Sequence, residues 1–305
     1  MRANPLVLFL RLSRPLFLLG GVLNYALGLG IARYLGVSID WNLALLGQLW
    51  VSSLQLATHY LNEYFDYPGD ALNPQRTPFS GGSGVLGAGP GQLRPVVALA
   101  AAYSMLTLTA LVTLTLLLQG ALSPLVSLLL LLIALGAVLY SVPPVRLASS
   151  GYGELTTVVL LANLLPALGF ALQAGELHRL LALSTFPLTM LTFASMLALE
   201  FPDYASDLRA DKQTLLVRLG WQRGLQMHHA CVFIAYALFA AAFVAGLPAA
   251  IAFPPWLSLP LALMQVWYLG RIGDGMRPHW SALTLNAVAL SVAASYLLAY
   301  SFWTR

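Results

Sequence analysis

The sequence predicts an all-α polytopic membrane protein, and three observations support this prediction. Of the 305 residues, 59% are hydrophobic and only 9% are charged. Soluble proteins carry about 25% charged residues, so the composition excludes a water-soluble domain, and the high hydrophobicity excludes a disordered chain. The apolar residues also occur in long stretches, each close to the length of about 20 residues with which a helix crosses a bilayer.

Nine stretches meet this length, so we expect nine transmembrane helices in a single integral-membrane domain of residues 1–305. The first follows a basic start but lacks a cleavage pattern, so it is expected to be a retained span rather than a signal peptide. The second and sixth each end in a run of acidic residues. Gly120 separates the third from the fourth, and Pro254 and Pro255 punctuate the eighth. The expected spans are residues 16–35, 41–61, 95–118, 122–140, 154–174, 184–201, 226–246, 250–270 and 281–303.

The distribution of basic residues predicts the orientation of these spans. With the N-terminus inside, the inner segments hold 12 of the 15 Lys and Arg residues, and the outer segments hold only Arg33, Arg179 and Arg305. Basic residues are enriched in cytoplasmic loops, so we expect a cytoplasmic N-terminus and a C-terminus on the opposite side. The outer loops 119–124 and 246–255 carry no charge. Function is therefore expected at the cytoplasmic loops.

The acidic residues gather on the same side of the membrane. Five of the seven aspartates fall in two short runs, which follow the second and sixth spans. In the first run, Asn62, Asp66 and Asp70 follow one another at intervals of four residues, and this spacing places helical side chains on one face. We expect Asn62 and Asp66 to share a face, and Pro68 and Gly69 to end the helix so that a loop presents Asp70.

The second run has the same spacing. Pro202 fits the first turn of a helix, which would align Asp203, Asp207 and Asp211 on one face. Any single aspartate at a helix end is also explained as a cap or as a solvated residue. Two runs of equal spacing on one side of the membrane favour a shared role, because aligned carboxylates repel each other and require a counter-ion.

Magnesium and a diphosphate fit these two runs. Hard oxygen ligands suit Mg²⁺, which is commonly bound by one or two carboxylates together with substrate phosphates. The lone Cys231 excludes a disulfide framework or a cysteine metal site. Lys212, the only lysine, directly follows the second run, and Arg76, Arg146 and Arg209 lie in the same inner loops. These bases can neutralise an anion, although loop orientation alone also explains basic residues here.

With these motifs, the chain resembles the UbiA superfamily of intramembrane prenyltransferases, whose members have nine helices, an NxxxDxxxD motif after the second and a DxxxD motif after the sixth. Residues 62–70 match the first motif, 203–207 match the second, and residues 212–220, KQTLLVRLG, match the sequence that follows. The stretches RTPFSGGSG at 76–84, YSVPPVRL at 140–147 and GYGE at 151–154 are most similar to the branch that prenylates 1,4-dihydroxy-2-naphthoate in menaquinone synthesis.

The resemblance implies transfer of a polyprenyl group from its diphosphate to an aromatic acceptor, with decarboxylation of dihydroxynaphthoate to give demethylmenaquinone. Mg²⁺, expected as two ions, would be held by Asp66, Asp70, Asp203 and Asp207 with help from Asn62, and Lys212 would act on the leaving diphosphate. No nucleic acid and no obligate protein partner are implied, and the expected location is the inner membrane of a prokaryotic cell, among its lipids. The further residues expected to bind substrate are Arg76, Tyr140, Ser141, Arg146, Tyr204, Arg209 and Asp211.

The chain departs from the family pattern at two places, and the second departure leaves the acceptor open. Asp211 stands where the family usually has glycine, and residues 199–202, LEFP, replace the polar lead-in typical of naphthoate enzymes. The alternative acceptors are 4-hydroxybenzoate, homogentisate, a chlorophyllide or a lipid glycerol. His59, one turn before Asn62, is either an aid to acceptor deprotonation or a structural histidine. A secondary transporter is the alternative from another functional class. Transport sites usually lie near the bilayer midplane, whereas these acidic residues are expected at the cytoplasmic ends of the helices.

Overall fold

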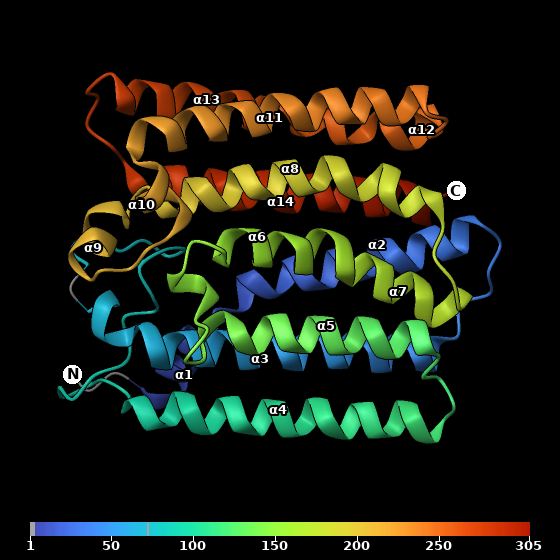
Figure 1. Ribbon diagram of the computed structural model, residues 1–305, viewed down its shortest axis with the longest axis horizontal. Coiled ribbons are helices and arrows are strands. Elements are labelled where there is room, and N and C mark those ends of the chain that lie inside the picture. The colour runs from blue at the N-terminus through green and yellow to red at the C-terminus, as the bar shows by residue number, and fades with distance from the viewer. Residues whose placement is uncertain (1–3, 72) are drawn as a thin grey trace.

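A computed structural model describes residues 4–71 and 73–305 of the protein. Within these residues the chain is helical throughout, without a β-strand. Long helices lie side by side with their axes roughly aligned, as Figure 1 shows. The elements are α1 (Pro5–Ser13), η1 (Pro15–Phe17), α2 (Leu18–Tyr34), α3 (Trp41–Asp70), α4 (Pro95–Leu118), α5 (Pro124–Ser141), η2 (Leu147–Ser149), α6 (Gly153–Val158), η3 (Val159–Leu164), α7 (Leu165–Ala174), α8 (Arg179–Glu200), α9 (Tyr204–Arg209), α10 (Leu215–Leu219), α11 (Trp221–Val244), α12 (Ala249–Ala252), η4 (Pro254–Ser258), α13 (Leu259–Gly273) and α14 (Trp280–Trp303).

The membrane character of the bundle is confirmed. Among the described residues, eight helical segments are long and apolar enough to cross a membrane, and each overlaps one of the spans expected from the sequence. The other expected span, residues 41–61, forms part of the 30-residue helix α3. α3 packs within the same bundle, against α4 and α5. Its mean hydropathy, however, is lower than that of the eight other segments. Polar side chains along it, including Gln48, Ser52 and Gln55, account for the difference.

Local sequence signals explain where several helices begin. Asp40 precedes α3, and its carboxylate accepts hydrogen bonds from the backbone N–H groups of Asn42 and Leu43. Ser123 caps α5 by accepting from Val126 N. α4 and α5 also begin with proline, whose missing N–H costs nothing in the first helical turn. These caps satisfy backbone donors that have no partner inside the helix.

The core is organised around α2 and α7. One buried cluster joins α2 to α8, α11 and α14, and a second joins α2 to α3, α5 and α7. α2 and α7 cross closely at Gly28: a Cβ atom there would overlap the carbonyl oxygen of Pro166 and lie 2.8 Å from the backbone nitrogen of Phe170. Small residues allow such close backbone approach between membrane helices.

The end of α3 differs from the expectation that Pro68 and Gly69 would stop the helix. That expectation is wrong, because α3 continues to Asp70. Pro68 lies in the last turn, where its missing N–H removes only one hydrogen bond. The end is then closed by Ala71 N, which donates to Tyr67 O at 3.0 Å, and by Arg76 Nη2, which donates to the Asp70 carbonyl at 2.7 Å.

The alignment expected for the second acidic run is also wrong at Asp211. α9 ends at Arg209, and Asp211 follows with a φ of 53°, in the left-handed region, with its side chain exposed. The backbone N–H of Lys212 donates to Asp207 O at 2.9 Å, which closes the helix and turns the chain back. Asp211 therefore leaves the face that Asp207 occupies, while Lys212 is directed into the bundle.

We predict that Gly28→Ala destabilises the protein. The added methyl group has no space at the α2–α7 crossing, and overpacking of this kind costs about 1–3 kcal/mol. The measurement is the thermal midpoint in detergent, which should fall. Gly20→Ala is the matched control on the same helix, since its nearest neighbour would be Leu161 Cδ1 at 3.9 Å. Alanine favours helices over glycine, so this control should keep or raise the midpoint, and equal midpoints for the two variants would contradict the close crossing.

Candidate active site

The connections that follow α3, α5 and α8 gather at one end of the bundle, together with α1, α9 and α10, while the C-terminus lies at the other end (Figure 1). A cavity of about 280 Å³ lies at this end, lined by α3, α5, α6, α8 and the connections between them. Seven of the 13 residues singled out from the sequence line it. They are Asn62, Asp66, Asp70, Tyr140, Asp203, Asp207 and Lys212.

Asp66 is the most fully paired carboxylate of the cavity. Its Oδ2 lies 3.0 Å from Lys212 Nζ and accepts a hydrogen bond of 2.9 Å from Asn62 Nδ2. Its Oδ1 lies 3.6 Å from Arg146 Nη2. Asp66 is only 8% exposed, and a buried charge requires partners of this kind. The residue thus joins α3 to the segment after α9 and to the segment after α5.

Asp203 is held by the loop that follows α3. Asn73 Nδ2 donates to its Oδ1 at 2.6 Å, and the backbone N–H of Gly81 donates to its Oδ2 at 2.9 Å. Gly81 has a φ of 75°, and a Cβ atom there would lie 2.6 Å from Asn73 Nδ2. Glycine at this position therefore permits both the turn and the contact with the carboxylate, so the glycine-rich loop binds an aspartate of the protein itself.

Asp70 and Asp207 differ from the first two aspartates. Within residues 4–71 and 73–305, no side-chain or backbone donor binds their carboxyl oxygens, although both residues line the cavity. Burial raises the pKa of Asp70 to about 7, against the opposing effect of Lys212 and with a further rise from Asp66. Burial likewise raises the pKa of Asp207 to about 7, again opposed by Lys212 and reinforced by Asp203. The positive charge near these two carboxyl groups is therefore too small to stabilise both of them in the ionised form.

The pKa of Lys212 is set by the negative charges around its ammonium group. Burial by itself lowers the pKa of its ammonium group, but the neighbouring carboxylates Asp66, Asp207 and Asp70 outweigh this effect, so the net pKa is raised. Lys212 is therefore charged at neutral pH. Lys212 and Arg146 face four aspartates, and the remaining negative charge suits a divalent cation.

The donor set fits Mg²⁺ that is shared with a substrate. Oxygen ligands are what Mg²⁺ prefers, and it commonly uses few carboxylates and completes its shell with water and phosphate oxygens. No three carboxylate, histidine or cysteine side chains of the described chain converge on one point. An all-protein metal cage is thus not formed in these residues, and Asp70 and Asp207 are the two of the four aspartates whose oxygens are open to a cation.

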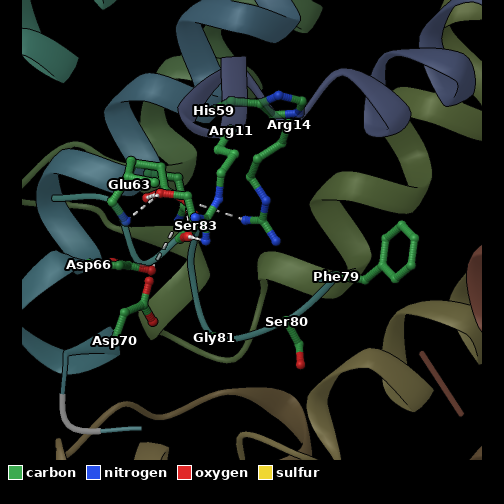
Figure 2. Close-up of polar contacts among 12 residues, drawn as sticks. Arg11, Arg14, His59, Glu63, Asp66, Asp70, Phe79, Ser80, Gly81 and Ser83 are labelled. Carbon is green, nitrogen blue, oxygen red and sulfur yellow. Dashed lines mark hydrogen bonds and ion pairs between the residues drawn. The ribbon is translucent and has the colours of Figure 1, made fainter. Parts of the chain in front are cut away.

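A second polar network supports the wall of the cavity, as Figure 2 shows. Glu63, 3% exposed, accepts hydrogen bonds from Ser83 N at 2.7 Å and Ser83 Oγ at 2.6 Å, and lies 3.6 Å from Arg14 Nη1. Arg11 Nη2 reaches Ser83 O at 3.5 Å. The segment that includes α1 is thereby tied to the glycine-rich loop. Arg14 also lines the cavity itself.

The other residues singled out from the sequence lie outside the cavity lining. Arg76 donates through Nε to Gly81 O at 2.6 Å and through Nη2 to Asp70 O, so it holds the loop and the end of α3. Arg146 reaches the site only through Asp66. Tyr204 packs edge-on against Trp221 with ring centroids 5.7 Å apart. Of the rest, Ser141 is buried, and Arg209 and Asp211 are exposed.

His59 lines the cavity, and its Nδ1 lies 3.4 Å from the carbonyl oxygen of Ser13. Its ring also packs edge-on against Phe17, with centroids 6.1 Å apart. One ring nitrogen is thus occupied by the backbone, which favours a structural role.

Sequence reasoning missed several polar residues of this end. Arg14, Glu154 and Glu200 line the cavity, while Glu63 and Asn73 hold the glycine-rich loop. The scarcity of charge could have indicated the glutamates, because the chain has only four and three of them lie at the cavity end of the bundle. No spacing pattern marked them, and nothing in the sequence marked Asn73.

Comparison with known proteins agrees with this geometry. Residues 22–281 match the UbiA prenyltransferase family, whereas a comparison with curated protein sequences gave no match. Three structures are among the solved ones that share the fold. A UbiA homologue from Archaeoglobus fulgidus, bound to GPP and Mg²⁺, is 18% identical with a TM-score of 0.65, covering 95% of this chain and 99% of its own.

The two other structures match over similar lengths. A UbiA homologue from Aeropyrum pernix K1 is 16% identical with a TM-score of 0.63, covering 93% of this chain and 96% of its own. A digeranylgeranylglyceryl phosphate synthase is 14% identical with a TM-score of 0.57, covering 98% and 97%. Together with the family match over most of the sequence, these likenesses lead to one conclusion: the chain belongs to the UbiA prenyltransferase family.

Proposed function

We propose that this protein transfers a polyprenyl group from an allylic diphosphate to 1,4-dihydroxy-2-naphthoate, which loses its carboxyl group as CO₂ to give demethylmenaquinone. The observation that carries the proposal is the meeting of two aspartate runs and Lys212 at one cavity. Membership of the family supports prenyl transfer, and the A. fulgidus homologue bound to GPP and Mg²⁺ supports a diphosphate substrate and a divalent metal. The identity of the acceptor goes beyond what family membership supports, and it rests on the sequence motifs and on the cavity.

At the diphosphate end, Asp70 and Asp207 would hold Mg²⁺, with Asp66, Asp203 and Asn62 around them and two ions expected. The metal, when bound, neutralises charge on the diphosphate and makes it a better leaving group. Lys212 contributes a fixed positive charge at the same place, where charge develops as the carbon–oxygen bond breaks. We assign Arg76 and Arg146 to positioning, because their guanidinium groups contact backbone carbonyls and Asp66.

The rest of the cavity suits an isoprenoid chain and its cation. Tyr140 lines the polar end, and an aromatic face attracts a cation, so this side chain would shield the allylic cation. Much of the remaining wall is apolar, as an isoprenoid tail requires. The apolar side chains that line it are Val51, Leu54, Ile133, Leu160, Leu161 and Leu165.

Arg14 supports an acceptor that carries a carboxylate. Its Cζ lies 4.6 Å from the ring centroid of Phe17, which packs edge-on against Phe79 with centroids 5.8 Å apart. Lys212 is paired with Asp66, whereas Arg14, another cation of the described lining, lies 3.6 Å from Glu63 and makes no ion pair with the aspartates of the described residues. A guanidinium beside aromatic rings suits a planar aromatic acid. Dihydroxynaphthoate, 4-hydroxybenzoate and homogentisate share this chemistry, whereas a lipid glycerol does not.

The proposed setting is the inner membrane of a prokaryotic cell, with the site on the cytoplasmic side. The excess of basic residues in the segments at the site end supports this orientation.

We predict that Asp70→Asn and Asp207→Asn each lower the rate of prenyl transfer at least about 100-fold, because removing one charge-stabilising group at a reacting centre has effects of this size. Neither change removes a contact within the described chain, so the thermal midpoint should stay near that of the wild type. Asp274→Asn, an exposed aspartate after α13, is the control and should retain full activity. Normal turnover in both site variants would contradict the metal assignment.

The acceptor is tested with purified protein in lipid, Mg²⁺, geranylgeranyl diphosphate and a panel of acceptors, with products identified by mass. We expect Mg²⁺-dependent pyrophosphate release and a prenylated, decarboxylated product from dihydroxynaphthoate, and chelation of the metal should stop both. A product from 4-hydroxybenzoate alone would overturn the choice of acceptor. Absence of pyrophosphate release and of product with every acceptor would overturn prenyl transfer itself.

A further inference from the structure

We propose that Tyr25 closes the apolar end of the cavity and thereby sets the longest isoprenoid chain that the cavity can hold. This inference rests on the proposed function, because it concerns the prenyl substrate of the same cavity. Tyr25 lies on α2 and is fully buried, and it belongs to none of the motifs that mark the polar end. Its place is at the opposite end of the space that the substrate would occupy.

The cavity runs along α3 from the aspartates to Val51. Asp66 and Val51 both line it and are 15 positions apart in this helix, which corresponds to about 22 Å at the rise of an α-helix. On α3 and α7, Val51 and Leu165 are the lining residues farthest from the site end of the bundle. They are 2% and 4% exposed, so this deep end of the cavity lies inside the bundle.

The length of the cavity suits a chain of limited size. Three backbone bonds of an extended polypeptide span about 3.5 Å, so the four chain bonds of an isoprene unit span about 4.7 Å. With the diphosphate at the aspartate end, about four such units fit between it and the deep end. A longer chain would have to pass the residues that lie beyond Val51 and Leu165.

Tyr25 lies directly beyond the deep end. Gly47 is one helical turn past Val51 on α3, and Gly169 is one turn past Leu165 on α7. A Cβ atom at Gly47 would overlap Tyr25 Oη, and one at Gly169 would lie 3.3 Å from Tyr25 Cδ2. The ring of Tyr25 therefore extends from α7 to α3 and fills the space that these two glycines leave open.

Packing, rather than hydrogen bonding, explains a large side chain at this position. The hydroxyl of Tyr25 is buried and has no hydrogen-bond partner within residues 4–71 and 73–305, and a buried hydroxyl is unfavourable without one. Tyr25 belongs to the same buried cluster as Val51, Leu54 and Leu165, and these three residues line the cavity. The side chain thus contributes volume at the end of the cavity, and its ring sets how far a chain can extend.

The test measures the equilibrium binding of prenyl diphosphates that grow by one isoprene unit at a time, namely geranyl, farnesyl, geranylgeranyl and geranylfarnesyl diphosphate. The protein is purified in lipid with Mg²⁺ and without an acceptor, and each compound displaces labelled geranyl diphosphate. Lipid is as apolar as the cavity wall, so units that fit should change the affinity little. A unit that meets Tyr25 overpacks the deep end, which lowers the affinity about 10- to 100-fold. We expect this loss between geranylgeranyl and geranylfarnesyl diphosphate in the wild type.

Two variants should move this length limit in opposite directions. Tyr25→Ala removes the ring and leaves a space comparable to an isoprene unit, so it should bind geranylfarnesyl diphosphate as tightly as geranylgeranyl diphosphate. Val51→Phe places a ring inside the cavity at its deep end, so the loss should already occur with geranylgeranyl diphosphate. This second variant creates no void, and it keeps the test decisive if Tyr25→Ala does not fold.

Two further variants separate the length limit from a general loss of packing. Tyr25→Phe keeps the ring and loses only the hydroxyl, so it should keep the wild-type limit. Phe239→Ala also removes a fully buried ring, but on α11 and in the other buried cluster. It should lower the thermal midpoint, as large-to-small changes in a core do, without moving the limit.

A wild type that binds all four chain lengths equally would overturn the inference, because the tail would then leave the cavity sideways. Val51→Phe with the wild-type limit would overturn it too, as would a folded Tyr25→Ala with that limit. Failure of the proposed function has a different signature, since it leaves the wild type without prenyl transfer to any acceptor in the panel, whatever length limit its binding shows.

Discussion

The buried ion pair between Asp66 and Lys212 is the interaction on which the rest of the site depends. Its partners lie 146 positions apart in the chain and 3.0 Å apart in space. Without Lys212, the buried Asp66 would keep Arg146 as its charged partner at 3.6 Å, and weakening a buried pair in this way is unfavourable. The pair therefore holds the end of α3 against the segment after α9. Together with the bonds from Asn73 and Gly81 to Asp203, this contact makes the two acidic runs of the sequence face the same cavity.

The four aspartates divide into two kinds because the protein supplies donors to only two of them. Asp66 and Asp203 are bound by side chains and by backbone N–H groups. Asp70 and Asp207 keep open oxygens, and burial raises the pKa of each to about 7, as it also raises the pKa of Asp203. The bound pair fixes the geometry of the loops, and the open pair provides the affinity for a cation. Glu154 has a structural contact of the same kind, because its Oε1 accepts a hydrogen bond from Leu215 N and holds α10.

Much of the fold could be predicted because the bilayer restricts the chain so strongly. A helix that crosses a membrane satisfies all its backbone groups internally, so long apolar stretches lead directly to helices, as at residues 95–118. The prediction was weaker where local rules competed with tertiary contacts. Pro68 predicted a helix end, but Arg76 binds the terminal carbonyl and the helix reaches Asp70. Asp211 shared the spacing of its neighbours, but α9 had already ended.

The class of the protein, its helical spans and the two aspartate runs could be predicted from the order of residues, because charge is scarce in a membrane protein and regular spacing is visible along a chain. The packing of the helices was needed to show which aspartates are paired, which are open, and that Arg14, Glu154 and Glu200 line the same cavity. Single charged residues far apart in the chain carry no spacing pattern. Their meeting depends on how the helices pack, and that packing is set by contacts such as the α2–α7 crossing, which the sequence does not display.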